Sequence, residues 1–331
     1  MAAQTPDETS APAHPDVLSL GEAMVELSAR EQVRLRDART FDLGWGGDTS
    51  NVAVAVSRLG RASSYVTRVG DDEFGANLLD LWRHEGVDTT GVGVDPGRPT
   101  GLYLLSRPPE GPHSFTYYRA GSAASAMQPA DLPTQLLRRA RIVHTSGITQ
   151  AIGAGPCDAA FAALRTAREA GVTTSYDPNL RPALWSLDRA QAVIMATLAL
   201  ADIALPSLED ARALTGLDDP GAIADELLGK GPQVVALKLG AAGALVADAD
   251  RQTIVAPFEV AAVDPAGAGD TFDAAFLTAW LDGNEPAECA EFANAAAALT
   301  TTGVGCVGPI PTREAVDELR AAQGRRTRSR A

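Results

Sequence analysis

The sequence predicts an α/β protein with a mostly parallel central sheet and a small, separate β-sheet. Three observations point to this class. Hydrophobic residues make up 45% of the 331 residues, enough for the core of one large domain with a small appendage. Short apolar runs alternate with helical patterns that close on glycine. Two aromatic segments near residue 110 flank a Pro/Gly-rich turn and interrupt this alternation.

The N-terminal part supplies the first strands and helices together with the small sheet. Residues 51–60 are small and apolar and end on a glycine, which predicts a buried helix. Residues 102–105 and 114–118 are expected to pair as a hairpin, joined by part of 24–43. The other expected elements are strands at 17–21 and 64–69 and a helix over 74–85.

From residue 141 onward, strands and helices alternate regularly. Strands are expected at 142–144, 172–176, 203–205, 234–238 and 244–247, and helices over 158–170, 190–200, 270–281 and 289–302. This alternation implies right-handed crossovers between parallel strands. In such sheets, ligands bind outside the carboxyl ends of the strands, where most of the motifs described below fall.

The chain ends are expected to lie outside a folded domain of residues 16–318. Residues 1–15 are polar, rich in Ala, Pro and Thr, and lack the basic flank and apolar stretch of a signal peptide, which predicts a disordered leader. Residues 319–331 include five arginines and predict a solvated basic tail, with contact to an anion as the alternative.

Composition argues against several classes of partner. A net charge of −14 argues against nucleic acid, because phosphate backbones require clustered Lys and Arg. No run of 18 or more apolar residues occurs, so no membrane span is predicted. Cys157, Cys289 and Cys306 are far apart and lack metal-ligand spacing, which favours buried thiols in a reducing, cytoplasmic compartment.

The strongest motif is the loop Gly267-Ala268-Gly269-Asp270, between a strand expected over 258–263 and an apolar helix. Its glycines let backbone N–H groups converge at the positive end of the helix, where they can stabilise a phosphoryl group in transit. Asp270 can accept a proton from a substrate hydroxyl at the same place. The alternative is a glycine turn in which Asp270 is an ordinary helix cap.

Three further loops carry polar groups suited to a small ligand. Gly46-Gly47 allows close backbone approach, and Asn51 offers a donor and an acceptor to sugar hydroxyls, or else caps its helix. Arg181, in the proline-stiffened loop 177–185, is suited to a carboxylate or phosphate, or else to a surface ion pair. The loop 238–243 predicts either a tight hairpin or a phosphate-side loop.

Together these loops resemble the ribokinase-like (PfkB) family of carbohydrate kinases over residues 17–311, nearly the whole chain. The resemblance implies a three-layer α/β/α sandwich with a small β lid, formed from parts of 22–45 and 98–120, and ATP with Mg²⁺ as phosphoryl donor. It implies that Asp270 is the catalytic base and that the amides of Gly267, Ala268 and Gly269 form the anion hole. It also places Ser207, Lys238, Gly240, Gly243 and Asn294 near the nucleotide.

Within the family, the chain is most similar to 2-keto-3-deoxygluconate kinases. The segments that carry this likeness are 101–103, 117–123, 144–148 and the loop 177–185, although fructokinases have a similar last loop. The resemblance places Gly47, Asn51, Tyr103, Tyr118, Arg119 and Arg181 around the sugar. Two arginines could neutralise a substrate carboxylate, which a neutral hexose would not require. Lid packing is the alternative for the tyrosines.

The sequence departs from the family pattern at two positions. Pro265 stands where a threonine usually precedes the glycine loop, which removes a hydroxyl and an N–H near any phosphate or monovalent cation. The Asn-x-x-Glu motif linked to Mg²⁺ is present as Ser207-Leu208-Glu209-Asp210. Asp210 is therefore expected to hold the metal through water.

The leading prediction is an ATP-dependent sugar-acid kinase that makes 2-keto-3-deoxy-6-phosphogluconate. The first alternative is a kinase for fructose or another neutral sugar. An alternative of another class is a catalytically silent sugar-binding protein on the same scaffold. A dehydrogenase is unlikely on sequence grounds, because no G-x-G-x-x-G follows the first strand. An exposed lid edge further predicts a homodimer or higher homo-oligomer.

Overall fold

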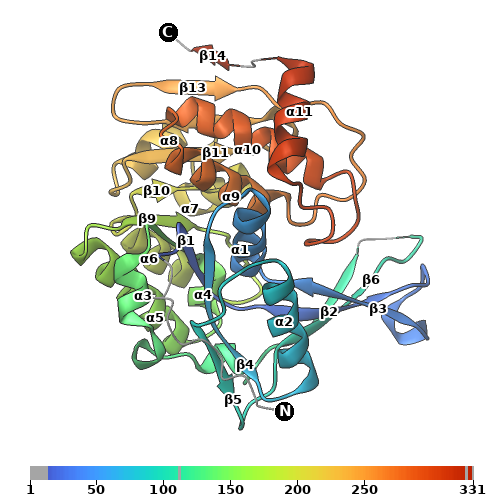
Figure 1. Ribbon diagram of the computed structural model, residues 1–331. Coiled ribbons are helices and arrows are strands. Elements are labelled where there is room, and N and C mark those ends of the chain that lie inside the picture. Colours follow the sequence, from blue (N-terminus) through green and yellow to red (C-terminus); the bar gives the residue numbers. More distant parts are fainter. Residues whose placement is uncertain (1–13, 111–112, 325–326, 330–331) are drawn as a thin grey trace, which may run out of the picture.

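The central sheet has the predicted mostly parallel architecture. The computed structural model describes residues 14–110, 113–324 and 327–329, in which ten strands form one sheet in the order β14-β13-β12-β11-β10-β9-β8-β1-β4-β5 (Figure 1). Pairing is parallel from β11 to β5 and antiparallel from β11 to β14. The strands are β1 Val17–Leu20, β4 Ser63–Gly70, β5 Val92–Asp95, β8 Ile142–Ser146, β9 Thr173–Asp177, β10 Ile203–Ala204, β11 Val234–Lys238, β12 Ala244–Ala247, β13 Gln252–Val255 and β14 Thr327–Ser329.

Helices cover both faces of this sheet and complete a three-layer sandwich (Figure 1). Alternation along β11 shows the two faces, because Val234 and Ala236 pack into one core while Val235 and Leu237 pack into another. The first core includes α1 Asp48–Arg58, α2 Glu73–His84, α9 Ala268–Leu281, α10 Pro286–Thr300 and α11 Arg313–Gln323. The opposite face carries α3 Thr134–Arg139, α5 Ala154–Glu169, α6 Leu187–Leu198, α7 Leu208–Thr215 and α8 Pro220–Leu228, and the short α4 Gly147–Ala151 follows β8.

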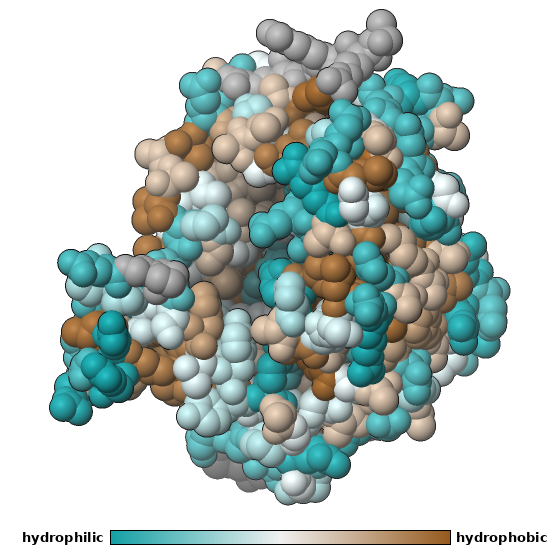
Figure 2. All heavy atoms as spheres, turned by 180° about the vertical axis from the view of Figure 1, so that it is seen from behind, coloured by the Kyte–Doolittle hydropathy of each residue, from teal (hydrophilic) through white to brown (hydrophobic). Residues whose placement is uncertain are grey.

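The second sheet projects from the sandwich as the predicted lid (Figure 1). Its strands are β2 Met24–Ala29, β3 Phe41–Gly46, β6 Leu102–Ser106 and β7 Ser114–Tyr118, in the order β3-β2-β6-β7. The expected hairpin is confirmed, since β6 and β7 pair antiparallel, with Tyr103 opposite Tyr117. Seen from behind, the surface is hollowed where this lid meets the large domain (Figure 2).

The predicted apolar helix after the glycine loop is confirmed as α9. Phe272, Phe276 and Trp280 stack along it, with ring centroids 6.2 and 6.4 Å apart. Nearly every residue from Thr271 to Ala279 is buried, because α9 packs against both α1 and α10. The loop that precedes α9 is therefore attached to the centre of the protein.

The expected strand over 258–263 is wrong. In the described structure this segment has no strand pairing, and Val263 is 65% exposed and donates its N–H to the carbonyl of Thr301. Its apolar residues suggested a strand. The position next to β12 in the sheet is instead taken by β13, which was not predicted. A coil, not a strand, leads into the glycine loop.

The C-terminal end contains more regular structure than a solvated tail. Residues 313–323 form α11, so the expected boundary at 319 falls inside a helix. The backbone of residues 327–329 pairs with β13 as β14. The leader is outside the described residues except for His14 and Pro15. Within the described residues, no helix has both the length and the apolarity needed to cross a membrane.

Candidate active site

Three of the predicted site residues gather with Asp177 at the carboxyl edge of the sheet. Asp177 ends β9 and Lys238 ends β11, while Asn51 lies in the first turns of α1 and Asp270 in the first turn of α9. These positions are far apart in the chain and meet because parallel strands place their carboxyl ends together.

Asp270 is held by Asn51, which identifies both as more than helix caps. Asn51 donates from Nδ2 to Asp270 Oδ2 at 2.7 Å. Gly267, not Asp270, occupies the cap of α9, and α1 begins three residues before Asn51. Burial raises the pKa of Asp270 to about 7, with the negative charge of Asp48 as the second cause. A base with this pKa can exchange a proton near neutral pH.

The glycine loop leaves backbone N–H groups free beside Asp270. Ala268 donates its N–H to Pro265 at 3.2 Å, so this amide is already used. Across the described residues, Gly267 N and Gly269 N have no hydrogen-bond acceptor. Gly267 has φ +75°, and a Cβ there would lie 2.7 Å from the carbonyl oxygen of Cys306. The loop can therefore offer two of the three predicted amides to an anion.

Lys238 lies under the loop in a buried ion network. Its ammonium is 2.9 Å from Asp177 Oδ2 and 2.9 Å from Asp273 Oδ1. A Cβ placed on Gly269 would lie 3.8 Å from Lys238 Nζ. Lys238 was predicted to lie near the nucleotide, and neither of its carboxylate partners was predicted.

The second glycine motif brings α1 close to β1. Gly47 has φ +124°, and a Cβ there would overlap the carbonyl oxygen of Glu22. The next residue, Asp48, accepts a hydrogen bond from Asn179 Nδ2 at 2.8 Å. Burial raises the pKa of Asp48. The loop after β9 and the start of α1 therefore share a polar contact beside the site.

The predicted sugar ligands on the lid differ in their availability. Tyr103 is buried and donates to Glu26, and Arg119 is paired with the fully buried carboxylate of Glu22. Tyr118 is 63% exposed. Arg181, on the loop after β9, is exposed, and within the described part of the chain its side chain donates only to the adjacent Leu180 carbonyl, at 3.0 Å.

The residues predicted near the nucleotide form two groups. Ser207 caps α7 and pairs by a β-bridge with Lys238. The loop 238–243 is a tight hairpin, in which β11 and β12 pair antiparallel and Gly240 has φ +60°. Gly243 and Asn294 meet at the end of β13, where Asn294 donates to Val255 O at 3.2 Å and a Cβ on Gly243 would overlap the same oxygen. Gly243 and Asn294 therefore hold the hairpin in place.

Four carboxylates of the site were missed or unassigned in the sequence analysis. Glu22, Asp48, Asp177 and Asp273 lie within or beside motifs that had been singled out, yet no spacing links them to their partners. One signal was present: Asp273 is a charged residue in an otherwise apolar helix, three residues after Asp270.

Asp210 is the predicted metal contact. Its side chain lies in the first turn of α7, where its own N–H bonds to Ser207, and burial raises its pKa. Among the described residues, no group of three or more His, Cys, Asp and Glu is arranged to hold a metal. A lone half-buried carboxylate fits a cation that keeps most of its ligands as water or phosphate oxygens.

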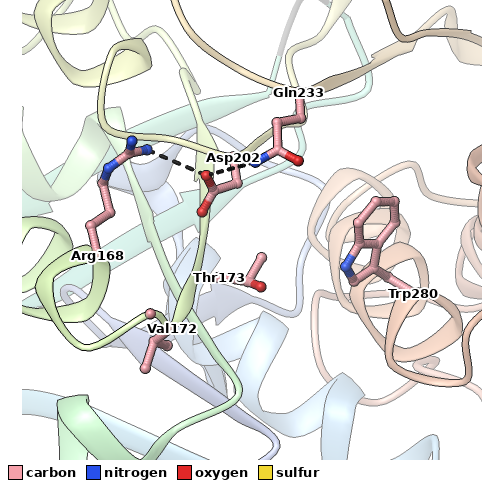
Figure 3. Close-up of a pocket in the computed structure, with 7 residues that line it drawn as sticks. Arg168, Val172, Thr173, Asp202, Gln233 and Trp280 are labelled. Atoms are coloured by element: carbon pink, nitrogen blue, oxygen red, sulfur yellow. Dashed lines mark hydrogen bonds and ion pairs between the residues drawn. The ribbon is translucent and has the colours of Figure 1, made fainter.

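A separate pocket lies at the opposite edge of the sheet (Figure 3). It has a volume of about 270 Å³ and is bordered by residues at the amino ends of β9, β10 and β11. Its polar groups bond mainly to one another, because Asp202 accepts from Arg168 and Gln233, both at 3.3 Å. We therefore assign this pocket a structural role.

Comparison with known proteins identifies close relatives. Residues 14–313 match the family model described as pfkB family carbohydrate kinase. The chain is 36% identical over 312 residues to 2-dehydro-3-deoxygluconokinase of Bacillus subtilis (strain 168), covering 93% of this chain and 96% of that one. It is 35% identical over 317 residues to fructokinase-1 of Zea mays, covering 92% and 97%.

Solved structures show the same similarity. The crystal structure of a PfkB protein from Polaromonas sp. JS666 has a TM-score of 0.84 at 34% identity, covering 92% of this chain and 99% of that one. A fructokinase from Xylella fastidiosa with bound ATP has a TM-score of 0.83 at 27% identity, covering 93% and 99%.

Proposed function

Because the chain belongs to the pfkB family of carbohydrate kinases, we propose that it transfers the γ-phosphoryl group of ATP to a hydroxyl of a sugar acid, 2-keto-3-deoxygluconate, forming its 6-phosphate. The observation that carries this proposal is the Asp270 carboxylate, held by Asn51 next to the free amides of Gly267 and Gly269. A candidate base and a candidate anion site therefore lie side by side at the start of α9.

The chain's own groups can accept the proton and stabilise the transferred phosphoryl group. The sugar hydroxyl gives its proton to Asp270 while its oxygen forms a bond to the γ-phosphorus, and the bond from that phosphorus to the β-phosphate oxygen breaks to release ADP. Asn51 orients the carboxylate through its 2.7 Å hydrogen bond. The free N–H groups meet the charge on the transferring oxygens. Positioning and charge neutralisation supply most of the catalysis.

Magnesium would accompany the nucleotide, with Asp210 contacting it through water. When bound, Mg²⁺ neutralises phosphate charge. The similarity to deoxygluconokinases and fructokinases supports ATP as donor, as does the fructokinase structure that contains ATP. A monovalent cation near Pro265 stays a prediction.

Arg181 supports an acidic sugar as the acceptor. It is the more available of the two predicted carboxylate ligands, since Arg119 is paired with Glu22. A guanidinium can bind a carboxylate with two parallel hydrogen bonds. Fructose remains the alternative acceptor, because the fructokinase from maize is nearly as similar as the deoxygluconokinase. A silent sugar-binding protein is disfavoured by the raised pKa and the hydrogen bond of Asp270.

The lid supports a homo-oligomer. The edge strand β7 exposes the rings of Phe115, Tyr117 and Tyr118 by 49, 50 and 63%. Pairing with a second copy would cover these rings and the open strand edge. A monomer mass in sedimentation at micromolar concentration would exclude this assembly. We further propose a cytoplasmic location, supported by free thiols at Cys157, Cys289 and Cys306.

The deciding experiment measures ADP release with 2-keto-3-deoxygluconate, fructose and ribose side by side. We expect preference for the keto-deoxy acid, and a loss of at least about 100-fold in kcat for Asp270→Asn. Arg181→Met should raise KM for the acid and leave turnover of fructose unchanged. Preference for a neutral sugar would keep the kinase and exclude the role of Arg181. No ADP release with a wide panel of sugars would favour the silent binder.

A further inference from the structure

A buried ion network joins three elements directly under the catalytic loop. Lys238 ends β11, Asp177 ends β9 and Asp273 lies in the second turn of α9. The ammonium contacts both carboxylates at 2.9 Å. Because Asp273 follows Asp270 by three residues, the two carboxylates lie on the same side of α9. The network thereby attaches the first turns of α9 to the edge of the sheet.

The charges of this network are enclosed by protein. The side chains of Lys238, Asp177 and Asp273 are 13, 7 and 1% exposed. Burial opposes the ionisation of all three groups. Even so, Lys238 lowers the pKa of Asp177, and the two carboxylates raise the pKa of Lys238. Burial raises the pKa of Asp273. The buried charges are balanced best when Lys238 pairs with an ionised Asp177 and Asp273 is protonated.

The sequence itself singles out this lysine. The chain has 28 basic Lys and Arg residues, and only Lys230 and Lys238 are lysines. Lys230 pairs with Glu226 on the surface at 2.7 Å. A compact ammonium can sit between two carboxylates where the broad guanidinium plane would not fit as well.

We propose that Lys238, fixed by Asp177 and Asp273, is a positioning residue that locks the first turn of α9 and keeps a positive charge beneath the Gly269–Asp270 step. This inference rests on the proposed role of Asp270 as base. It differs from the sequence prediction of a nucleotide contact, because the ammonium is already engaged by two carboxylates. Lys238 acts on the reaction through Asp270.

The charges around Asp270 define the consequence of losing Lys238. Burial, Asp48 on α1 and Asp177 on β9 raise the pKa of Asp270, whereas Asn51 and Lys238 lower it. The Cys306 thiol lies nearby, on the loop after α10. In a variant without the Lys238 ammonium, the negative charges of Asp48 and Asp177 raise the pKa of Asp270 further. Lys238→Met should therefore shift the acid limb of the kcat profile upward by about one pH unit and lower kcat at pH 7 about five- to tenfold.

The matched control is Lys230→Met, the same substitution at an exposed ion pair, which should leave the kcat profile unchanged. Asp177→Asn removes a negative charge and should shift the acid limb to lower pH, opposite to Lys238→Met. If Lys238→Met does not fold, Asp177→Asn decides the question by the direction of its shift. Unshifted pH profiles, or a Lys238→Met variant whose main defect is a raised KM for ATP, would overturn the positioning role.

A second readout separates this inference from the proposed function. The carboxyl ¹³C resonance of Asp270, assigned by its loss in Asp270→Asn, reports its titration without turnover. It should move to higher pH in Lys238→Met and to lower pH in Asp177→Asn. Identical titrations in all variants would contradict the inference even if the enzyme were active. An inactive wild type with shifted titrations would contradict only the proposed function.

Discussion

At the scale of single residues, Gly47 limits what the site can tolerate. Its φ of +124° disfavours any side chain, and a Cβ would overlap the Glu22 carbonyl and lie 2.8 Å from the Cα of Ala23. Gly47→Ala should lower the free energy of unfolding by about 2–4 kcal/mol, the sum of backbone strain and overpacking. Displacement of Asp48 and Asn51, which follow in α1, should also reduce kcat.

Gly121→Ala is the matched control for this prediction. Gly121 has φ +76°, but a Cβ there would meet nothing within 4 Å. Its substitution should cost about 1 kcal/mol and leave kcat unchanged. Urea unfolding of both variants separates the close contact from backbone strain. Equal losses of stability would show that contact with Glu22 and Ala23 is unimportant.

Residue types in the motifs indicated part of the candidate site in advance. Asp270, Asn51 and Lys238 were each identified from their loops, and the structure brings them to one edge of the sheet. Their partners were not identifiable, because Asp177 and Asp273 meet Lys238 from segments 61 and 35 residues away. Such pairs depend on the register of strands and helices, which a single sequence does not specify.

At the scale of elements, Arg58 fastens a loop of the site to α1. It donates from Nη1 to the carbonyls of Val307 at 2.9 Å and Ile310 at 2.8 Å, and pairs with Glu85 at 2.7 Å. The fastened loop includes Cys306, whose backbone packs against Gly267. The side chain of Arg58 is only 21% exposed, so its contacts are shielded from solvent.

Arg58→Ala should therefore lower the free energy of unfolding by about 2–4 kcal/mol, because it leaves buried carbonyls and Glu85 without their donor. It should also lower kcat, since the loop no longer supports the glycine turn. Arg83→Ala removes an exposed arginine of α2, paired with Asp80 at 3.4 Å, and should change neither quantity. Urea unfolding and ADP release measure both. Equal behaviour of the two variants would exclude the fastening role.

Most of the long helices were predicted, and several shorter or more polar ones were not. The helices α1, α2, α5, α6, α9 and α10 all match expected segments. The helices α7, α8 and α11 were missed. Charged and polar residues make up most of α11, in which Val316 is buried, and its second half was assigned to the basic tail. The segment 258–263 failed for the opposite reason, because apolar residues there do not join a sheet.

At the scale of the whole molecule, the sheet separates two kinds of polar cluster. The carboxyl edge gathers Asp270, Lys238 and Asp177 around free amides, whereas the amino edge carries the pocket in which Asp202 bonds to Arg168 and Gln233. Strand alternation made the parallel sheet predictable and so indicated the functional edge. In the antiparallel β12–β14 extension, β12 was predicted, whereas β13 was missed and residues 327–329 of β14 were assigned to the tail.

The centre of the sheet also makes stability depend on pH. His144 on β8 is 1% exposed and contacts Ser175 Oγ through Nδ1 at 3.1 Å. Burial lowers its pKa from 6.5 to about 4. Below pH 6.5, His144 is protonated in the unfolded chain, whereas in the folded protein it stays neutral down to about pH 4. The contribution of neutral His144 is therefore fully present above pH 6.5 and is lost as pH falls, by up to about 3 kcal/mol.

His144→Gln tests this sign directly, because an amide can keep a hydrogen bond to Ser175 but does not titrate. Urea unfolding at pH 7.5, 6 and 5 should show wild type losing about 1.4 kcal/mol more per pH unit than the variant below pH 6.5. Protonation of carboxylates such as Asp177 also destabilises the protein in acid, but it does so equally in wild type and variant. His84→Gln, at an exposed position on α2, should follow the wild-type curve. Parallel curves for wild type and His144→Gln would mean that His144 takes up its proton inside the fold.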